Sequence, residues 1–162
     1  MPSLGLPTGR EKKEATMSEM DLVKLYSGRI LELTTRIPHV GRLQAPQGSA
    51  RERSPLCGSS VSAEVVLSDG RVSEFAQQVK ACALGQAAAA VTGAAIIGCT
   101  PEQIDLACEQ LAAMLDGGPV PDAPFADFEA LSAARDFRNR HASIQLALKA
   151  VQAAVRQAGA RD

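Results

Sequence analysis

Residues Val61 to Ser68 alternate with a period of two. Val61, Ala63, Val65 and Leu67 fall on one face and Ser62, Glu64, Val66 and Ser68 on the other, as in a half-buried strand. Asp69-Gly70 follows, a dipeptide that favours the positive φ of a tight hairpin turn, so a return strand is expected from about Arg71 to Val79. A shorter strand near Ser49 to Arg53 would complete a three-stranded antiparallel sheet.

The segments outside this region have helical spacing of apolar residues. Thr100-Pro101-Glu102-Gln103 combines an N-cap threonine, a proline at the first helical position and a glutamine that completes a capping box. The other predicted helices are Asp21–Thr35, the alanine-rich Gln86–Ile97, a short one at Asp127–Ala134 and a last one at Ala142–Ala158. The pattern predicts an α+β fold, with the three-stranded antiparallel sheet packed against several α-helices.

The 162 residues are enough for one domain with a single core. We expect that domain to span residues 20–160, after a disordered leader over residues 1–19 that is rich in proline, glycine and charge. Aromatic residues make up only 3% of the chain and tryptophan is absent, so the core must be built from Ala, Val, Ile and Leu.

Charge and hydropathy exclude several classes of partner. The net charge is −1 and the pI is about 6.1, so there is no overall positive field to attract nucleic acid or an anionic membrane. No apolar run approaches the roughly 20 residues that cross a bilayer. Residues Met1 to Met20 contain no apolar signal-peptide region. We therefore expect a cytoplasmic protein whose cysteines are reduced thiols.

The four cysteines divide into two groups. Cys108 lies in an apolar helical stripe and Cys99 directly precedes the Thr100 cap, so both are expected to pack as small hydrophobic residues. Cys57 lies in a turn-like stretch, and Cys82 lies where a strand gives way to a helix. A helix N-terminus lowers a thiol pKa and favours the thiolate that binds metal or attacks sulfur. For these two cysteines a packing role and a chemical role both stay open.

Few other side chains suggest chemistry. His141 stands at the start of the last helix, where capping or packing competes with a ligand role. Ser59 offers an oxygen, although neutral serine is a poor metal ligand, and His39 lies in a turn and is assigned no chemistry. No pair of carboxylates lies in an apolar setting, so acid–base hydrolysis has little support and no enzyme activity is expected.

The order of these segments, over about residues 21–158, resembles the iron–sulfur cluster assembly scaffolds of the IscU, SufU and NifU N-terminal type. Leu25–Glu32 and Pro38–Leu43 resemble the family's opening helix and its Pro-x-x-Val-Gly turn. The segments that resemble those carrying the three family cysteines are Leu56–Ser59, Ala81–Ala87 and Arg140–Ser143.

The resemblance implies a metal site formed by Cys57, Cys82 and, as in the subset with His-Cys, His141. Two residues depart from the family pattern, because Ser59 replaces an aspartate and Ala142 replaces the third cysteine. Three ligands are one short of the usual four of a cluster, whereas two cysteines, a histidine and an open position are an ordinary arrangement for Zn²⁺. The implied cofactor is a transient iron–sulfur cluster or Zn²⁺. Water, an exogenous thiol, a partner or a second subunit would complete the site.

The leading hypothesis is a non-enzymatic scaffold-like protein that binds a metal ion or transient cluster. The resemblance implies a cysteine desulfurase and cluster-recipient proteins as partners, and a homodimer stays open because a second subunit could supply the missing ligand. One alternative is an acceptor of persulfide sulfur from a desulfurase, against which the absence of a cysteine at position 142 counts. The other is a degenerate zinc-binding protein that acts through protein contacts.

Overall fold

The computed structural model describes residues 27–55 and 58–160. The elements are α2 (Gly28–Thr34), β1 (Gly48–Arg53), β2 (Ser60–Ser68), β3 (Arg71–Lys80), α3 (Ala83–Ala95), α4 (Pro101–Leu115), the 3₁₀ helices η1 (Ala126–Asp136) and η2 (Arg138–Arg140), and α5 (His141–Ala160). The predicted α+β fold with a three-stranded antiparallel sheet is confirmed. The leader predicted over residues 1–19 and the start of the helix predicted from Asp21 lie outside the described residues.

The sheet has the order β1-β2-β3. Asp69 and Gly70 both have positive φ, 55° and 74°, as the predicted hairpin requires. The register between β2 and β3 shifts at Val66/Leu67, which is a β-bulge. The β1 strand begins at Gly48, pairs with β2 and lies at the edge of the sheet.

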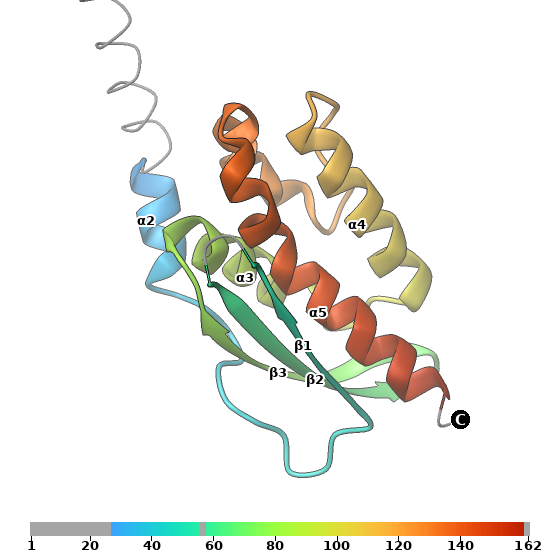
Figure 1. Ribbon diagram of the computed structural model, residues 1–162. Helices are drawn as coiled ribbons and strands as arrows, with labels where there is room; N and C mark the ends of the chain where they lie inside the picture. The colour runs from blue at the N-terminus through green and yellow to red at the C-terminus, as the bar shows by residue number, and fades with distance from the viewer. Residues whose placement is uncertain (1–26, 56–57, 161–162) are drawn as a thin grey trace, which may run out of the picture.

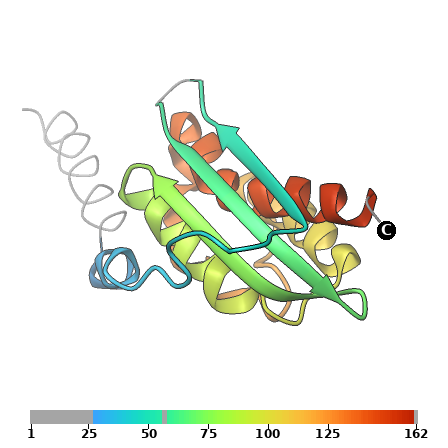
Figure 2. The ribbon, with the colours of Figure 1, turned by 90° about the horizontal axis from the view of Figure 1, so that it is seen from below.

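Helices cover one face of this sheet (Figures 1 and 2). The α5 helix lies along β1 and β2, and α3 and α4 pack beside α5. The segment 35–47 crosses the opposite face, where Val40 forms an isolated parallel bridge with Gln77. The face that the helices leave uncovered is called the open face below.

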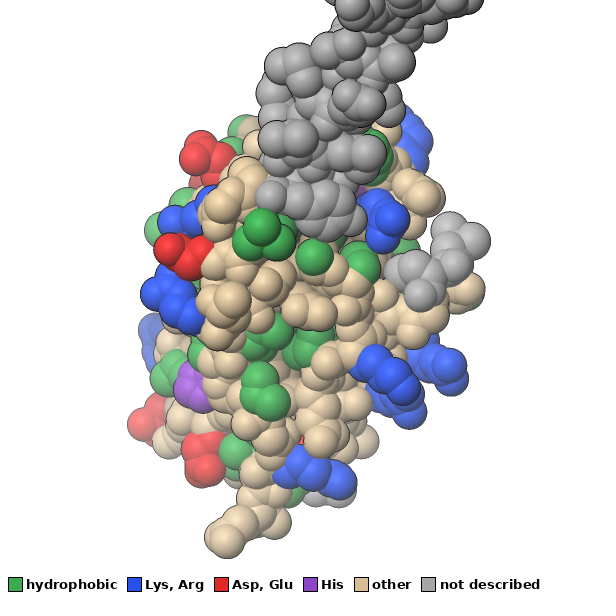
Figure 3. All heavy atoms as spheres, turned by 90° about the vertical axis from the view of Figure 1, so that its left-hand side faces the viewer, with side chains coloured by type: hydrophobic (Ala, Val, Ile, Leu, Met, Phe, Trp, Pro, Cys, Tyr) green, Lys and Arg blue, Asp and Glu red, His purple; other side chains and the backbone are tan. Residues whose placement is uncertain are grey.

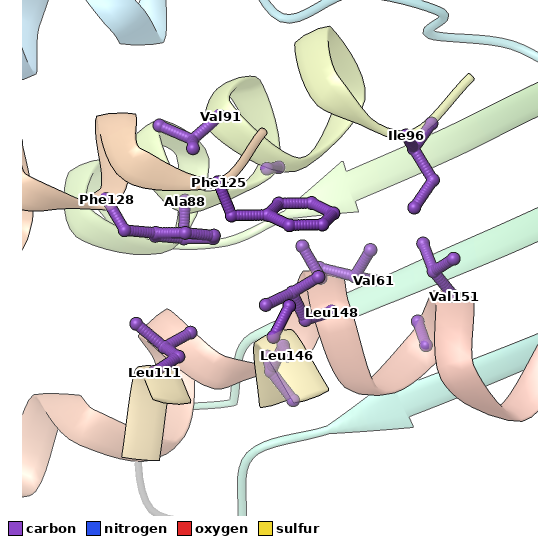
Figure 4. Close-up of a cluster of buried hydrophobic side chains, with 14 of the residues drawn as sticks. Val61, Ala88, Val91, Ile96, Leu111, Phe125, Phe128, Leu146, Leu148 and Val151 are labelled. Carbon is purple, nitrogen blue, oxygen red and sulfur yellow. The ribbon is translucent and has the colours of Figure 1, made fainter. Parts of the chain in front are cut away.

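The core lies between the sheet and the helices and is mostly aliphatic, as predicted. In α3 the four consecutive alanines from 87 to 90 are all buried, and these small side chains let neighbouring backbones approach closely. Three phenylalanines add to this core: Phe75, and the pair Phe125 and Phe128, whose stacked rings have centroids 6.4 Å apart (Figure 4). None of the helices within the described segments is long and apolar enough to span a membrane.

The short helix predicted at Asp127–Ala134 is present and is the 3₁₀ helix η1. Its buried residues Phe128, Leu131 and Ala134 recur every three positions. A helix with three residues per turn places such residues in one line, whereas an α-helix would rotate them away from the core. The α5 helix begins at His141, one residue earlier than predicted.

Arg135 of η1 stabilises the C-terminal end of α4. Its Nε donates to the carbonyl of Met114 at 3.1 Å, and its Nη2 donates to that of Gly118 at 3.2 Å. We expect Arg135→Met to lower the free energy of unfolding by about 1–2 kcal/mol, because both carbonyls lose a charged donor. Urea denaturation followed by circular dichroism measures this change.

Arg138→Met is the matched control. The Arg138 guanidinium lies 3.8 Å from the Asp116 carboxylate and its side chain is 82% exposed, so this ion pair contributes little. A loss as large as that of Arg135→Met would show that the cost comes from removing any arginine of this segment rather than from the two carbonyl contacts.

Candidate functional site

Cys82 lies between β3 and α3 and is the N-cap residue of α3. Its backbone is extended, with φ −66° and ψ 170°, and its side chain makes no capping hydrogen bond. The half-buried thiol therefore lies at the N-terminal end of a 13-residue helix, where unpaired backbone N–H groups favour a negative charge. This position agrees with the strand-to-helix junction predicted from the sequence.

Two serines extend this thiol into a chain of three polar side chains. The Sγ of Cys82 lies 3.3 Å from the Oγ of Ser143, in the first turn of α5. The Oγ of Ser143 donates to the Oγ of Ser59, which lies 3.2 Å away. Ser143 is 1% exposed and Ser59 is 3% exposed, so only the cysteine end of the chain approaches solvent. The turn before β2, the start of α3 and the start of α5 thus meet at one place.

The surroundings of Cys82 favour its thiolate form. Burial alone would raise the pKa of the thiol. The hydrogen bond with the Ser143 side chain, the nearby backbone N–H groups of Gly85 and Leu84 and the Arg140 side chain favour the thiolate, and together they outweigh burial and lower the pKa below its ordinary value. A thiolate held by several donors is a competent ligand for a metal ion and a competent nucleophile.

The serine chain can serve either protonation state of Cys82. With a neutral thiol, the S–H donates to Ser143, which donates to Ser59. Ser143 has a single hydroxyl hydrogen, so a Cys82 thiolate requires this hydrogen to turn from Ser59 toward sulfur. The Ser59 hydroxyl can then donate to Ser143. Deprotonation thus reverses the direction of the chain without leaving a buried oxygen unpaired.

Gly85 allows α3 and α5 to approach each other at this point. An added Cβ at this position would lie 2.6 Å from the Oγ of Ser143 and 2.8 Å from the Cβ of Ala81. Cβ atoms in proteins do not approach other atoms this closely. The short distance between Cys82 and Ser143 therefore requires a glycine, which has no side chain, at position 85.

His141 begins α5 with its ring half-buried against η1. Its Nε2 lies 3.0 Å from the carbonyl oxygens of both Ala134 and Arg135. Carbonyls only accept hydrogen bonds, so Nε2 carries the proton and the neutral ring keeps its lone pair on Nδ1. In the described part of the chain, no hydrogen bond joins His141 to Cys82.

The ligand set implied by the sequence is not assembled among the described residues. Cys57 lies outside them, and no three His, Cys, Asp or Glu side chains within residues 27–55 and 58–160 form a group that could hold a metal ion. Ligation by Cys57, Cys82 and His141, with Ser59 as an auxiliary, stays a prediction. Cys99 and Cys108 pack against the core as expected. Burial raises the pKa of both thiols, that of Cys108 to about 11.

Sequence reasoning missed Ser143 and Arg140 as neighbours of the Cys82 thiol. The available signal was a polar residue inside the buried stripe of the last helix, directly before Ile144. Arg140 lies three residues before Ser143, so both lie on the same side of the chain as it enters α5. Serine is common near helix starts for capping, so the signal alone does not indicate a thiol partner.

We expect Ser143→Ala to raise the pKa of the Cys82 thiol, because it removes the side-chain hydrogen bond that lowers this pKa most. The fraction of thiolate at neutral pH falls, so iodoacetamide should modify Cys82 severalfold more slowly in the metal-free variant. The midpoint of the rate–pH profile should shift to higher pH. Mass spectrometry of the peptide that contains Cys82 follows this residue separately from the other cysteines. The exposed control Ser68→Ala should leave the profile unchanged, and an unshifted profile in Ser143→Ala would contradict the assigned role.

Comparison with solved structures identifies the class to which this fold and thiol site belong. The structure superposes on a nitrogen-fixing NifU-like protein (N-terminal) from Brucella abortus with a TM-score of 0.84 and 37% sequence identity, covering 88% of this chain and 99% of the other. The chain therefore belongs to the IscU/SufU/NifU N-terminal-type family of iron–sulfur cluster assembly scaffolds. The predicted family membership is confirmed.

Two further structures share the fold. A candidate iron–sulfur cluster assembly scaffold protein for the SUF system from Fervidobacterium islandicum AW-1 matches with a TM-score of 0.75 and 16% identity, over 82% of this chain and 98% of the other. A protein described only as hypothetical matches with a TM-score of 0.72 and 22% identity, over 83% of this chain and 98% of the other. No protein-family model and no curated protein matches the sequence significantly.

Proposed function

We propose that this protein is a cytoplasmic scaffold on which an iron–sulfur cluster is assembled and from which it is released, with Cys57, Cys82 and His141 as protein ligands. Membership of the scaffold family supports the general role. The observation that carries the proposal is the Cys82 thiol. It lies at a helix N-terminus, it is half-exposed, and its pKa is lowered by donors from four other residues. The cluster is cargo in this proposal, and the protein itself performs no catalysis.

Each proposed ligand has support from its surroundings. An iron atom of the cluster bound at Cys82 would replace the proton that Ser143 and Arg140 already help to remove. His141 donates its Nε2 proton to backbone carbonyls, the arrangement by which metal-binding histidines are oriented to bind through the other nitrogen. We assign Nδ1 as the ligand atom. Cys57 follows from the resemblance and from its place in the sequence between β1 and β2.

Ala142 leaves the site one ligand short, which suits release better than storage. Ser59 is a poor fourth ligand, since its oxygen is buried and already bonded to Ser143. A water molecule, an external thiol or a partner's side chain would complete the coordination and would leave again when the cluster is transferred. We propose a cysteine desulfurase as the sulfur donor and apo iron–sulfur proteins as recipients.

Anaerobic reconstitution with iron and sulfide tests the proposal. The wild-type protein should develop the visible absorption of thiolate-to-iron charge transfer, and Cys57→Ala and Cys82→Ala should each lose it. Cys99→Ala is the matched control, because this thiol packs in the core. Bands of equal intensity in both ligand variants would sink the assignment. Elemental analysis of the freshly isolated protein separates iron from Zn²⁺, and tightly held stoichiometric zinc would favour the degenerate zinc-binding alternative.

A second function, acceptance of persulfide sulfur, is favoured by the lowered pKa of Cys82. A thiolate is the form that attacks the persulfide of a desulfurase, releasing the desulfurase cysteine as a thiolate and keeping the outer sulfur. Incubation with a desulfurase and cysteine should then increase the mass of the peptide that contains Cys82 by about 32 Da, the mass of one sulfur atom, as expected for a reactive thiol. Absence of the added sulfur, with the cluster band intact, would leave the scaffold role alone.

A further inference from the structure

The edge strand β1 presents unpaired backbone groups. Two hydrogen bonds define which residues face β2: the N–H of Ser54 donates to the carbonyl of Ser59, whereas the N–H of Ser49 donates to the side chain of Gln157 on α5. Residues of an antiparallel strand alternate between these two directions. Arg51 and Arg53 therefore direct their N–H and C=O groups away from β2, like Ser49.

These outward groups have no hydrogen-bond partner within the described segments. Both arginine side chains are exposed and lie on the open face of the sheet, because Ala50 and Glu52, which alternate with them, lie on the helix side opposite the buried Ala63 and Val61. Ser60 of β2 pairs with Arg53 on one side and with Lys80 of β3 on the other, so Lys80 and Arg53 lie in the same row across the sheet. The free edge and the three cations form one continuous surface, which we call the β1 edge.

The one carboxylate of β1, Glu52, lies on the opposite face of the strand from the exposed Arg51 and Arg53. Glu64 is the carboxylate of β2 on the open face, and it already accepts from the N–H of Leu43 at 2.7 Å and pairs with Arg42 at 3.5 Å. In Figure 3 the Lys and Arg side chains on the right-hand side have no Asp or Glu side chain among them, whereas the visible Asp and Glu side chains gather on the left. The positive charge is therefore local, in a chain whose net charge is −1.

We propose that the β1 edge docks an extended acidic segment of a partner protein, which pairs with β1 as a fourth strand. Backbone groups of Arg51 and Arg53 would supply the hydrogen bonds, and alternate carboxylates of the segment would face the two guanidiniums. Charge disfavours a second copy of this chain as the occupant, because pairing two β1 strands places arginine opposite arginine. The β1 strand leads into the turn that ends at Ser59, so the partner would lie beside the Cys82 site. This docking goes beyond the cluster-binding proposal and does not depend on bound metal.

A labelled ten-residue peptide that alternates glutamate with valine is the probe, with a lysine–valine peptide as its opposite. Fluorescence anisotropy with the full chain should show binding of the acidic peptide only, weakening as salt is raised. Hydrogen exchange should show new protection of the Arg51 and Arg53 amides. Arg51→Glu/Arg53→Glu should weaken binding at least tenfold, whereas Arg36→Glu, an exposed charge reversal at the end of α2, should have no such effect.

Arg51→Pro separates strand pairing from simple charge attraction. The N–H of Arg51 faces outward, so proline removes no bond to β2 and the fold should persist by circular dichroism. Arg51→Pro should lose peptide binding, whereas the double variant Arg51→Ala/Arg53→Lys should retain it. This combination of results would support strand addition. Equal binding by Arg51→Pro and wild type, binding of both peptides alike, or no binding of the acidic peptide would each overturn the proposal. Because these measurements use metal-free protein, they give the same answer whether or not the cluster reconstitution succeeds.

Discussion

Replacing Gly48 by alanine is expected to lower the free energy of unfolding by about 3 kcal/mol, at the upper end of the cost of overpacking a core. Gly48 begins β1 on the buried side of the sheet, directly against α5. An added Cβ would collide with the backbone carbonyl oxygen of Ala154 and would lie 2.8 Å from the amide nitrogen of Ala158. Backbone atoms held by the hydrogen bonds of a helix cannot swing aside, so α5 or β1 must shift as a whole.

Urea denaturation of Gly48→Ala measures the loss of stability. The control is Gly159→Ala, in the α5 helix against which Gly48 packs. An added Cβ at Gly159 meets nothing within 4 Å. This control should be unchanged or slightly more stable, because alanine is the better helix former. Comparable stability of Gly48→Ala and wild type would show that the sheet and α5 are not packed at the distance described.

The fold followed from signals that are local in the sequence. Alternation in β2, the Asp69-Gly70 turn and the Thr100 capping box each depend on residues within a few positions, and the capping box is present in the structure with both of its hydrogen bonds. The helix at η1 was predicted from the same kind of local signal, which did not specify its 3₁₀ type. Over a short stretch, apolar residues three positions apart fit both an α-helix and a 3₁₀ helix. Only packing against the neighbouring helices decides between the two.

The candidate site was predictable only in part, because its contacts join distant segments. The helix N-terminus at Cys82 is a local feature, and it was found. Its hydrogen bond to Ser143 spans 61 positions, and the bond from Ser143 to Ser59 spans 84. Nothing in the spacing of small polar residues marks such a pairing. It depends on how closely α3 and α5 pack, and that distance is set by a glycine whose role appears only in three dimensions.

The other large effect is expected at this glycine. Gly85→Ala should lower the free energy of unfolding by about 2 kcal/mol, although alanine has the higher helix propensity, because overpacking outweighs the propensity gain. The added Cβ would meet the Oγ of Ser143 and the Cβ of Ala81. Relief of the contact with Ser143 moves the start of α5 away from α3 and breaks the hydrogen bond between Ser143 and Cys82.

The same substitution should therefore raise the pKa of the Cys82 thiol. The hydrogen bond from Ser143 is the largest of the effects that lower this pKa, so its loss decreases the thiolate fraction at neutral pH. Alkylation of Cys82 in metal-free Gly85→Ala should slow severalfold and respond to pH as in Ser143→Ala. Gly28→Ala in α2, where an added Cβ meets nothing within 4 Å, should change neither stability nor reactivity appreciably.

A double-mutant cycle tests whether the two effects have one cause. In Ser143→Ala the contact at 2.6 Å is absent, and the remaining contacts of an added Cβ are those to Ala81 at 2.8 Å and to the Ser143 backbone oxygen at 3.3 Å. Gly85→Ala should then cost about 1 kcal/mol less than in the wild type, a coupling typical of side chains in direct contact. It should also slow alkylation no further, since the hydrogen bond is already gone. Additive losses in stability and further slowing of alkylation would mean that Gly85 acts on Cys82 by a route other than the spacing of α3 and α5.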